Sequence, residues 1–291
     1  MQGVINVFKN SGMTSFDVVR KIKKIARERK VGHTGTLDPE AFGVLPVCLG
    51  KATKIIDYIM TAPKTYKVIF SLGFKTTTYD LEGEVLDRKD ISHLNENEIL
   101  EAINSFKGTY SQIPPMYSAL KKNGVRLYEL ARQGIEIERE GRDITIFDIK
   151  DISIDLPEIT MTVTCSKGTY IRSLCYDIGE KLNVYGTMVN LRRTATSIFK
   201  EEDSVNIDLL TEDNIEEYLI PIEDALEAYP KTIINNKFRN LLINGARVYD
   251  RRLLKDNIED NILYRVYDED NIFIGLGIKD KDGFKLEKLL M

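Results

Sequence analysis

The chain has 291 residues, of which 43% are hydrophobic and 30% charged, a composition typical of a folded globular protein rather than a disordered one. No apolar stretch approaches the roughly 20 residues that a membrane-spanning helix needs. The N-terminus lacks the basic and apolar segments of a secretory signal. Three cysteines without a CxxC pair and only two histidines predict neither a disulfide framework nor a Cys/His zinc site, so we expect a cytoplasmic protein.

The net charge of −4 is unevenly distributed along the chain. Residues 1–75 carry 13 Lys/Arg against 5 Asp/Glu, whereas residues 201–291 carry 12 against 21. A basic N-terminal portion is the electrostatic footprint that a polyanion such as nucleic acid requires. A solvated basic helix would show the same pattern, so charge alone leaves both interpretations open.

Hydrophobic periodicity and turn residues predict alternating strands and helices. Thr14 or Ser15 and then Asn95 are suited to cap helices. We expect Glu82–Leu86 to form a hairpin with the strand at 65–74. The expected strands are 3–8, 44–49, 65–74, about 143–154, 158–166, 186–198, 262–267 and 272–278, and the expected helices are about 15–29, 51–60, 95–106, 125–133 and 170–181.

Two segments interrupt this regular pattern. Residues 108–142 contain paired prolines and two short basic stretches, which indicates a projecting insertion. Residues 201–229 hold eleven acidic residues and neither Lys nor Arg, which indicates an acidic connector or a domain boundary. The strand signals of the last 60 residues predict a small β-rich domain after that boundary.

The most informative segment for chemistry is the loop Gly32-His33-Thr34-Gly35-Thr36-Leu37-Asp38-Pro39. Glycines allow close approach of a ligand, and Pro39 biases Asp38 toward an extended backbone that presents its carboxylate. An Asx turn, in which Asp38 bonds only nearby amides, is the ordinary structural alternative.

Familiar catalytic motifs do not fit the sequence. Gly50-Lys51-Ala52-Thr53 resembles the end of a phosphate-binding P-loop, but position 45, where that motif needs an earlier glycine, is Leu. His33 and Asp38 are close in sequence, yet no GxSxG elbow supplies a nucleophile for a hydrolase.

Two further segments offer partners for Asp38. Tyr66 stands between Lys64 and Lys67 at the start of a predicted strand, and Arg172 falls at the start of a predicted helix. A cation at a helix N-terminus opposes the helix dipole, and a nearby carboxylate would explain it. A core tyrosine and a solvated arginine remain the structural alternatives.

Five segments, taken in order, resemble one known family. They are GHTGTLDPEAFGVLPVCLGKATK, KTYKV, IPPMYSALKKNGVRLYELARQG, CSKGTYIRSL and LRRTA. The sequence over about residues 3–200 strongly resembles the TruB family, the bacterial tRNA pseudouridine-55 synthases. The chain departs from the family pattern at Lys9-Asn10, where Lys-Pro is usual, and at Ala41-Phe42-Gly43, where Ala-Thr-Gly is common.

The resemblance implies an α+β fold in two parts. Residues 1–229 would form a pseudouridine synthase catalytic domain with a mixed, largely antiparallel sheet flanked by helices. Its insertion at about 108–142 would clamp the RNA, and its acidic connector would span about 201–229. Residues 230–291 would form a small β-rich, PUA-like RNA-binding domain.

The resemblance also assigns roles to individual residues. It implies that Asp38 acts on the sugar as nucleophile or base, that Arg172 pairs with Asp38, and that Tyr66 stacks on the uracil near C5. The RNA-binding residues that it implies are His33, Tyr170, Leu191, Lys9, Lys121, Lys122, Arg126 and Arg132. Asp38 would be the only carboxylate that these motifs place at the sugar. The reaction is redox-neutral and consumes no nucleotide, so no cofactor and no metal are expected.

The expected partner is the T-arm of tRNA, bound by a monomer without a guide RNA or a membrane. A non-catalytic RNA-binding or RNA-folding module on the same scaffold is the main alternative. A guide-RNA-dependent synthase and a hydrolase that uses His33 and Asp38 are less well supported by the motifs.

Overall fold

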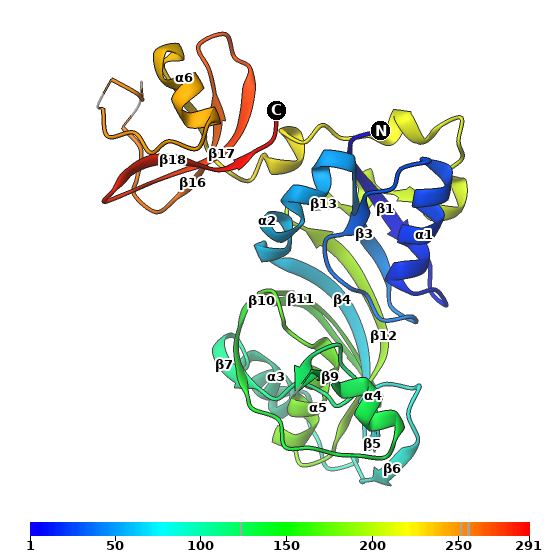
Figure 1. The fold of residues 1–291 in the computed structure, drawn as a ribbon. Coiled ribbons are helices and arrows are strands. Elements are labelled where there is room, and N and C mark those ends of the chain that lie inside the picture. The colour runs from blue at the N-terminus through cyan, green and yellow to red at the C-terminus, as the bar shows by residue number, and fades with distance from the viewer. Residues whose placement is uncertain (123, 251, 255–256) are drawn as a thin grey trace.

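The computed structural model describes residues 1–122, 124–250, 252–254 and 257–291. Its largest feature is a curved, ten-stranded sheet (Figure 1). The strands of this sheet are β1 (Gly3–Lys9), β2 (Val31–His33), β3 (Phe42–Leu49), β4 (Lys64–Leu72), β7 (Gly108–Gln112), β10 (Arg142–Asp155), β11 (Glu158–Cys165), β12 (Gly186–Thr196), β13 (Phe199–Lys200) and β14 (Val205–Asn206).

The order of the main path is β14-β1-β3-β12-β4-β11-β10-β7, with β13 on β12 and β2 on β3. The β1–β14 and β3–β12 pairs are parallel and the other pairs are antiparallel. The predicted mixed, largely antiparallel sheet is therefore confirmed. The long central strands β4 and β12 join its two halves, and they carry the KTYKV and LRRTA segments.

Strand side chains alternate between the two faces of the sheet, and three of the helices cover one of these faces. Ile5, Leu45 and Phe70 belong to one buried core with side chains of three of the helices, α1, α3 and α5. The helices are α1 (Ser15–Ile25), α2 (Ile56–Thr61, preceded by a 3-10 helix at Gly50–Ile55), α3 (Glu96–Asn104), α4 (Leu127–Arg132), α5 (Ile171–Lys181) and α6 (Asn236–Ile243). None of those in the described residues is long and apolar enough to cross a bilayer.

A second, four-stranded sheet follows the acidic connector. It consists of β15 (Lys231–Ile233), β16 (Leu263–Tyr267), β17 (Phe273–Asp280) and β18 (Gly283–Leu289). It has its own core with α6 around Val266 and Phe284. Leu276 and Leu290 also pack with the other face of β1 and β3 and with α2, so the two parts share a buried cluster.

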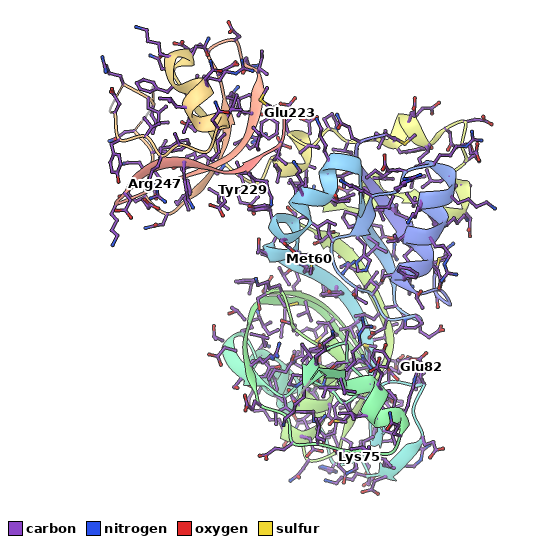
Figure 2. The ribbon with its side chains drawn as sticks, in the orientation of Figure 1. Met60, Lys75, Glu82, Glu223, Tyr229 and Arg247 are labelled. Atoms are coloured by element: carbon purple, nitrogen blue, oxygen red, sulfur yellow. The ribbon has the colours of Figure 1, made fainter. Side chains whose placement is uncertain are left out.

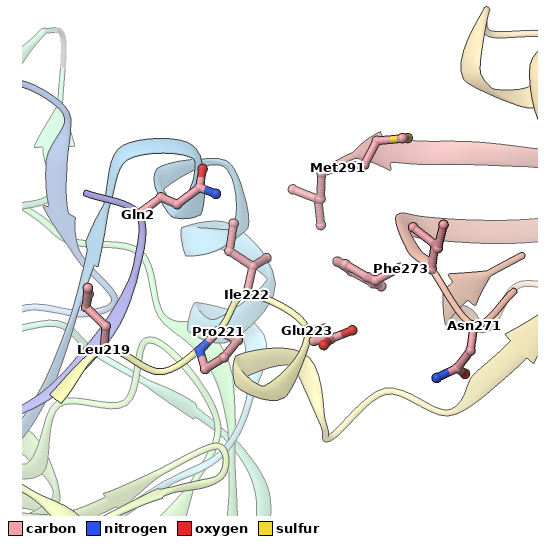
Figure 3. A pocket seen from close by; sticks show the side chains of 10 residues that line it. Gln2, Leu219, Pro221, Ile222, Glu223, Asn271, Phe273 and Met291 are labelled. Atoms are coloured by element: carbon pink, nitrogen blue, oxygen red, sulfur yellow. The ribbon is translucent and has the colours of Figure 1, made fainter. Parts of the chain in front are cut away.

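The junction between the two parts is partly open (Figure 3). A cavity of about 610 Å³ lies between Leu219–Ile222 of the connector and Phe273 and Met291 of the second sheet. Near this cavity, Arg265 of the second sheet connects the two parts. It donates hydrogen bonds to the backbone carbonyls of Tyr229 and Glu223, which are labelled in Figure 2.

The acidic connector consists of short 3-10 helices at Glu201–Asp203, Ile207–Leu209, Ile215–Tyr218 and Asp224–Leu226. It lies against α1 and the turn after it: Lys21 Nζ is 2.6 Å from Asp208 Oδ1, and Arg27 Nη2, just beyond the helix, is 2.5 Å from Glu212 Oε2. The connector therefore neutralises part of the basic helix.

The insertion at 108–142 is shorter than its sequence suggests. Gly108–Gln112 and Arg142–Ile146 pair with each other as β7 and β10, so only residues 113–141 leave the sheet. Those residues contain α4 and the two-stranded ribbon of β8 (Lys121–Lys122) and β9 (Val125–Arg126).

Three element boundaries differ from the predictions. α1 is capped by Thr14 but ends at Ile25 instead of Arg29, because Arg27 has a φ of 49° and cannot continue the helix. The predicted helix at 51–60 is half 3-10. The hairpin partner is β6 (Val85–Arg88), which pairs only with β5 (Phe74–Thr76) in a separate ribbon.

Candidate active site

The loop that carries Asp38 connects β2 to β3 and is held by the segment that follows β1. Ser15 Oγ accepts from Leu37 N–H (2.8 Å) and donates to the Leu37 carbonyl (3.0 Å). The Pro39 carbonyl accepts from Lys9 Nζ (2.9 Å) and from Gly12 N–H (3.1 Å). The backbone on both sides of Asp38 is thereby fixed, which is what a precisely placed carboxylate requires.

Asp38 pairs with Arg172, as the resemblance implies. Arg172 Nη2 lies 3.0 Å from Asp38 Oδ2, although the two residues are 134 positions apart in sequence. The Arg172 side chain is 7% exposed and the Asp38 side chain 39%. The arginine is thus buried behind a carboxylate that a ligand can reach, and the Asx-turn interpretation is not needed.

Arg172 makes three more contacts through its planar fork. Its Nη1 reaches Asp80 Oδ2 at 3.2 Å and the Thr78 carbonyl at 3.3 Å, and its Nη2 reaches the Tyr117 carbonyl at 2.9 Å. A guanidinium with several fixed acceptors holds a single orientation. Arg172 therefore links the Asp38 loop, the loop before β6 and the insertion.

Asp80 is a site residue that the sequence patterns did not reveal. Asp38 was expected to be the only carboxylate here, but Asp80 shares the same arginine. Its Oδ1 accepts from Thr78 Oγ1 and from the backbone N–H of Glu82, which is labelled in Figure 2. The Asp80 side chain is only 10% exposed, so it faces the arginine whereas Asp38 faces the solvent.

Tyr66 and Leu191 lie on the two central strands. Tyr66 is in β4 and Leu191 in β12, where it pairs with Val68, and both side chains are buried. Burial raises the pKa of Tyr66, so its phenol is neutral near pH 7. The strands place an aromatic ring and an aliphatic side chain beside the Asp38 loop, which suits the walls of a base-sized pocket.

Tyr170 precedes α5 and is fixed by a buried glutamine from β7. The Tyr170 N–H donates to Gln112 Oε1 (2.8 Å), and Gln112 Nε2 donates to the Tyr170 carbonyl (3.1 Å). Gln112 is another residue that no sequence motif singled out. It fastens the start of α5, and hence Arg172, to the edge of the insertion.

His33 ends β2, and its imidazole is neutral in the folded protein. Its Nδ1 accepts from the Gly35 N–H at 3.2 Å, which leaves the proton on Nε2. Burial, together with the nearby Arg193 cation, lowers the pKa of His33. A neutral, half-buried ring is suited to stacking or to a single hydrogen bond with a base.

Lys9 was predicted to contact RNA, and the structure places it differently. The side chain is fully buried and its ammonium donates to the carbonyls of Asn10, Met13 and Pro39. A lysine in that position cannot reach a phosphate without abandoning three hydrogen bonds. Lys9 instead supports the loop beside Asp38.

Lys64 is a second buried lysine, and it gives a pH-dependent prediction. Its ammonium donates to the carbonyls of Met60 and Ala62, and burial lowers the pKa of Lys64 to about 8. Between that value and the ordinary lysine pKa of about 10.4, the unfolded state binds more protons than the folded state. The Lys64 contribution to the free energy of unfolding should therefore rise as the pH increases through this interval.

The test compares wild type with Lys64→Met and with Lys67→Met, a control at an exposed position of the same strand. Urea unfolding at several pH values from about 7.5 to about 10 should show a smaller rise only for Lys64→Met, because Lys9, whose pKa burial also lowers to about 8, remains in all three proteins. Parallel pH profiles of all three proteins would contradict this role of Lys64.

The four cations of the insertion are exposed. Lys121 and Lys122 lie on β8, and Arg126 and Arg132 lie at the two ends of α4. Both arginines stack over the Tyr128 ring, at 5.8 and 5.4 Å from its centroid. These side chains form a basic surface with an aromatic centre, which is typical of nucleic-acid contacts.

Two family models together match most of the chain. Residues 23–171 match the N-terminal domain of the TruB family pseudouridylate synthases, and residues 172–227 match the C-terminal domain of tRNA pseudouridylate synthase B. Asp38 and Tyr66 lie within the first match, and Arg172 is the first residue of the second match. This chain belongs to the TruB family of pseudouridine synthases.

Curated relatives match over the whole chain. A tRNA pseudouridine synthase B of Clostridium perfringens is 60% identical, over 100% of this chain and 99% of that protein. The Clostridium tetani enzyme of the same name is 56% identical over 100% of both chains.

Solved structures support the fold. A Cbf5-Nop10-Gar1 complex contains a chain with a TM-score of 0.76 and 30% identity, covering 99% of this chain and 85% of that one. A chain of an H/ACA RNP bound to a substrate RNA that contains 2'-deoxyuridine has a TM-score of 0.75 and 28% identity, with the same coverage.

Proposed function

We propose that this protein isomerises the uridine at position 55, in the T-loop of tRNA, to pseudouridine. The observation that carries the proposal is the exposed Asp38 carboxylate, held by buried Arg172 in a loop of the TruB type. Relatives that are 50–60% identical over nearly their full length are named tRNA pseudouridine synthase B, which supports tRNA as the substrate.

The reaction breaks the N1–C1′ bond of uridine, turns the uracil and joins its C5 to C1′. Asp38 acts at the sugar, either by attacking C1′ or by taking a proton from the sugar. Arg172 fixes the orientation of the Asp38 carboxylate through the 3.0 Å contact. Tyr66 packs against the uracil and lies near C5, where the last proton must leave. The residues proposed for catalysis are Asp38, Tyr66 and Arg172.

The target uridine must leave its base stack to reach Asp38, at a cost of a few kcal/mol. Tyr170 and Leu191 form walls that retain the detached uracil, and neutral His33 occupies the space that the base vacates. These roles follow the family resemblance. Their support here is that His33 directly precedes the Asp38 loop, that Tyr170 precedes α5, which carries Arg172, and that Leu191 lies on the strand beside that of Tyr66.

The protein acts on tRNA as a cytoplasmic monomer without a guide RNA. The exposed cations of the insertion supply a protein surface for the T-arm, as do those of α1 that the connector leaves unpaired. The small second sheet, residues 230–291, acts as a PUA-like RNA-binding domain after the catalytic domain of residues 1–229.

The decisive experiment is incubation of purified protein with unmodified tRNA transcript, followed by mapping of pseudouridine. We expect one modified position, uridine 55, and no product when that uridine is replaced by cytidine. A protein that binds the transcript tightly but forms no pseudouridine in any tRNA would be an RNA-binding module instead.

The insertion gives a separate prediction about affinity. Replacing Lys121, Lys122, Arg126 and Arg132 with alanine should weaken tRNA binding and flatten its salt dependence. Removing one cation that binds a phosphate should lower the slope of log K against log salt by roughly 0.7–0.9, because fewer counter-ions are released on binding. Binding titrations at several salt concentrations measure this slope directly.

The control for this prediction is Lys107→Ala with Lys150→Ala, two exposed cations outside residues 113–141, of which Lys107 precedes β7 and Lys150 lies on β10. The control should leave the slope nearly unchanged for each charge removed. An equal effect per charge in both variants would show that the insertion makes no special contact with RNA.

A further inference from the structure

Three cations are buried beneath the Asp38 loop without a carboxylate partner. Lys9, Lys64 and Arg193 are 0%, 6% and 1% exposed. All three donate to backbone carbonyls, and none of them forms an ion pair in the part of the chain that the structure describes. A buried charge that lacks a counter-ion is costly, so it calls for an explanation.

Arg193 occupies the most informative position of the three. It lies on β12 directly opposite Tyr66 of β4, in neighbouring strands of the sheet (Figure 1). Its Nε donates to the Val44 carbonyl at 2.7 Å and its Nη2 to the Gly35 carbonyl at 3.0 Å. The guanidinium therefore joins β3 to the loop that carries Asp38.

The residue that accepts from this guanidinium has an unusual backbone. Gly35 has a φ of 140°, a conformation that favours glycine, and its carbonyl accepts the bond from Arg193 Nη2. Arg192, the residue before Arg193 on β12, has a different environment. Arg192 is 42% exposed and pairs with Glu201, so two adjacent arginines have opposite environments.

The guanidinium belongs to the residue directly opposite Tyr66, and its positive charge lowers the pKa of the Tyr66 phenol. Burial raises the pKa of Tyr66, and Arg193 acts against that rise. The other groups that face the phenol are Cys165 of β11 and Asp38, and both raise its pKa. Among these groups, Arg193 is the one that favours the phenolate.

We propose that Arg193 is a positioning residue for the isomerisation, which acts through Tyr66 by supplying the positive charge beside it when the Tyr66 oxygen takes the C5 proton. This inference rests on the proposed function and adds to it a residue that acts through Tyr66. It also explains the missing counter-ion, because the negative charge that Arg193 compensates exists only while the phenolate is present.

The proton transfer conserves atoms and electrons. After C5 joins C1′, C5 carries both the sugar and a hydrogen, and an imine joins N1 to C6. Tyr66 first releases its phenol proton to solvent. Its phenolate oxygen then takes the C5 proton, and the C5–H electron pair forms the C5–C6 double bond. The former imine electrons move to N1, which takes a proton from solvent. One proton has moved from C5 to N1 in the product.

The test uses the full chain and a tRNA transcript with either hydrogen or deuterium at C5 of uridine. The variants are Arg193→Gln, Arg193→Lys and Tyr66→Phe, with Arg192→Gln as the matched control on the same strand. Single-turnover rates are measured with both RNAs over a range of pH, together with tRNA affinity and melting temperature.

We expect Arg193→Gln to lower the single-turnover rate by about tenfold for each unit by which the Tyr66 pKa rises. The C5 isotope effect should increase, because proton removal becomes slower relative to the other steps. The rate should keep rising to higher pH than in wild type. Arg193→Lys should recover part of the rate because it restores the charge, and Arg192→Gln should match wild type in isotope effect and pH profile.

Other outcomes would overturn the proposal. A slower, less stable Arg193→Gln protein with the wild-type isotope effect and pH profile would make Arg193 a structural cross-link only. If Arg193→Gln does not fold, Arg193→Met, which also lacks the charge, takes its place, and the same result in that variant overturns the proposal equally. Full activity of Tyr66→Phe would remove the role of Arg193 while the wild-type enzyme still forms pseudouridine. Absence of product from wild type would instead refute the proposed function.

Discussion

Asp38→Asn is expected to lower the rate of pseudouridine formation by several orders of magnitude. Asparagine is nearly isosteric, so the loop bonds through Leu37 and Pro39 should survive. The variant lacks the negative charge and the oxygen that would attack C1′ or accept a proton from the sugar. Its tRNA affinity should stay within about tenfold of wild type, or 1.4 kcal/mol. Single-turnover assays and binding titrations measure the two quantities separately.

The matched control is Asp80→Asn, a change at the second carboxylate on Arg172. Asp80 is buried against the arginine, so this variant should lose less activity and more thermal stability than Asp38→Asn. If Asp38→Asn kept substantial activity, Asp38 would not be the group that acts on the sugar. Equal activity losses in the two variants would assign the same importance to both carboxylates.

Arg172→Lys is expected to cause the second largest loss of turnover, with only a modest change in tRNA affinity. Lysine keeps the charge but not the planar fork, and Arg172 uses both ends of that fork. Its Nη1 contacts Asp80 and Thr78, and its Nη2 contacts Asp38 and Tyr117. A single ammonium cannot hold these acceptors together, so Asp38 should no longer keep a fixed orientation.

Arg192→Lys is the control for this substitution. Arg192 also grips a carboxylate with two nitrogens, that of Glu201, but at a half-exposed position away from Asp38. Its replacement should leave turnover close to wild type. Near-normal turnover of Arg172→Lys would show that the Asp38 pair is dispensable for catalysis.

The family resemblance predicted the Asp38–Arg172 pair, whereas the chemistry of the individual residues did not. Arg172 at a helix start suggested a carboxylate partner, but nothing in the spacing identified Asp38 among the 45 acidic residues. Only the order of five motifs connected the two. The contact that the structure shows, 3.0 Å long, agrees with that implication. The catalytic roles of the residues stay predictions until the variants are measured.

The site residues that the sequence analysis missed lie at positions where sequence patterns say little about side-chain contacts. Asp80 stands in a turn-rich segment before β6, and it reaches Arg172 only because that loop folds back beside α5. Arg193 belongs to the LRRTA motif, but arginines are rarely buried unpaired, so its inward position was not expected. Lys9 was wrongly predicted to contact RNA because buried lysines are equally rare.

The neutralisation of α1 by the connector affects how the protein would meet a polyanion. Asp208 pairs with Lys21 of α1 and Glu212 pairs with Arg27 just after it, whereas most of the basic N-terminal portion keeps its charge. A molecule with a net charge of −4 then still carries a strong electric dipole. The electric field of an approaching RNA exerts a torque on this dipole and orients the protein before contact. This orientation should weaken as added salt shortens the Debye length.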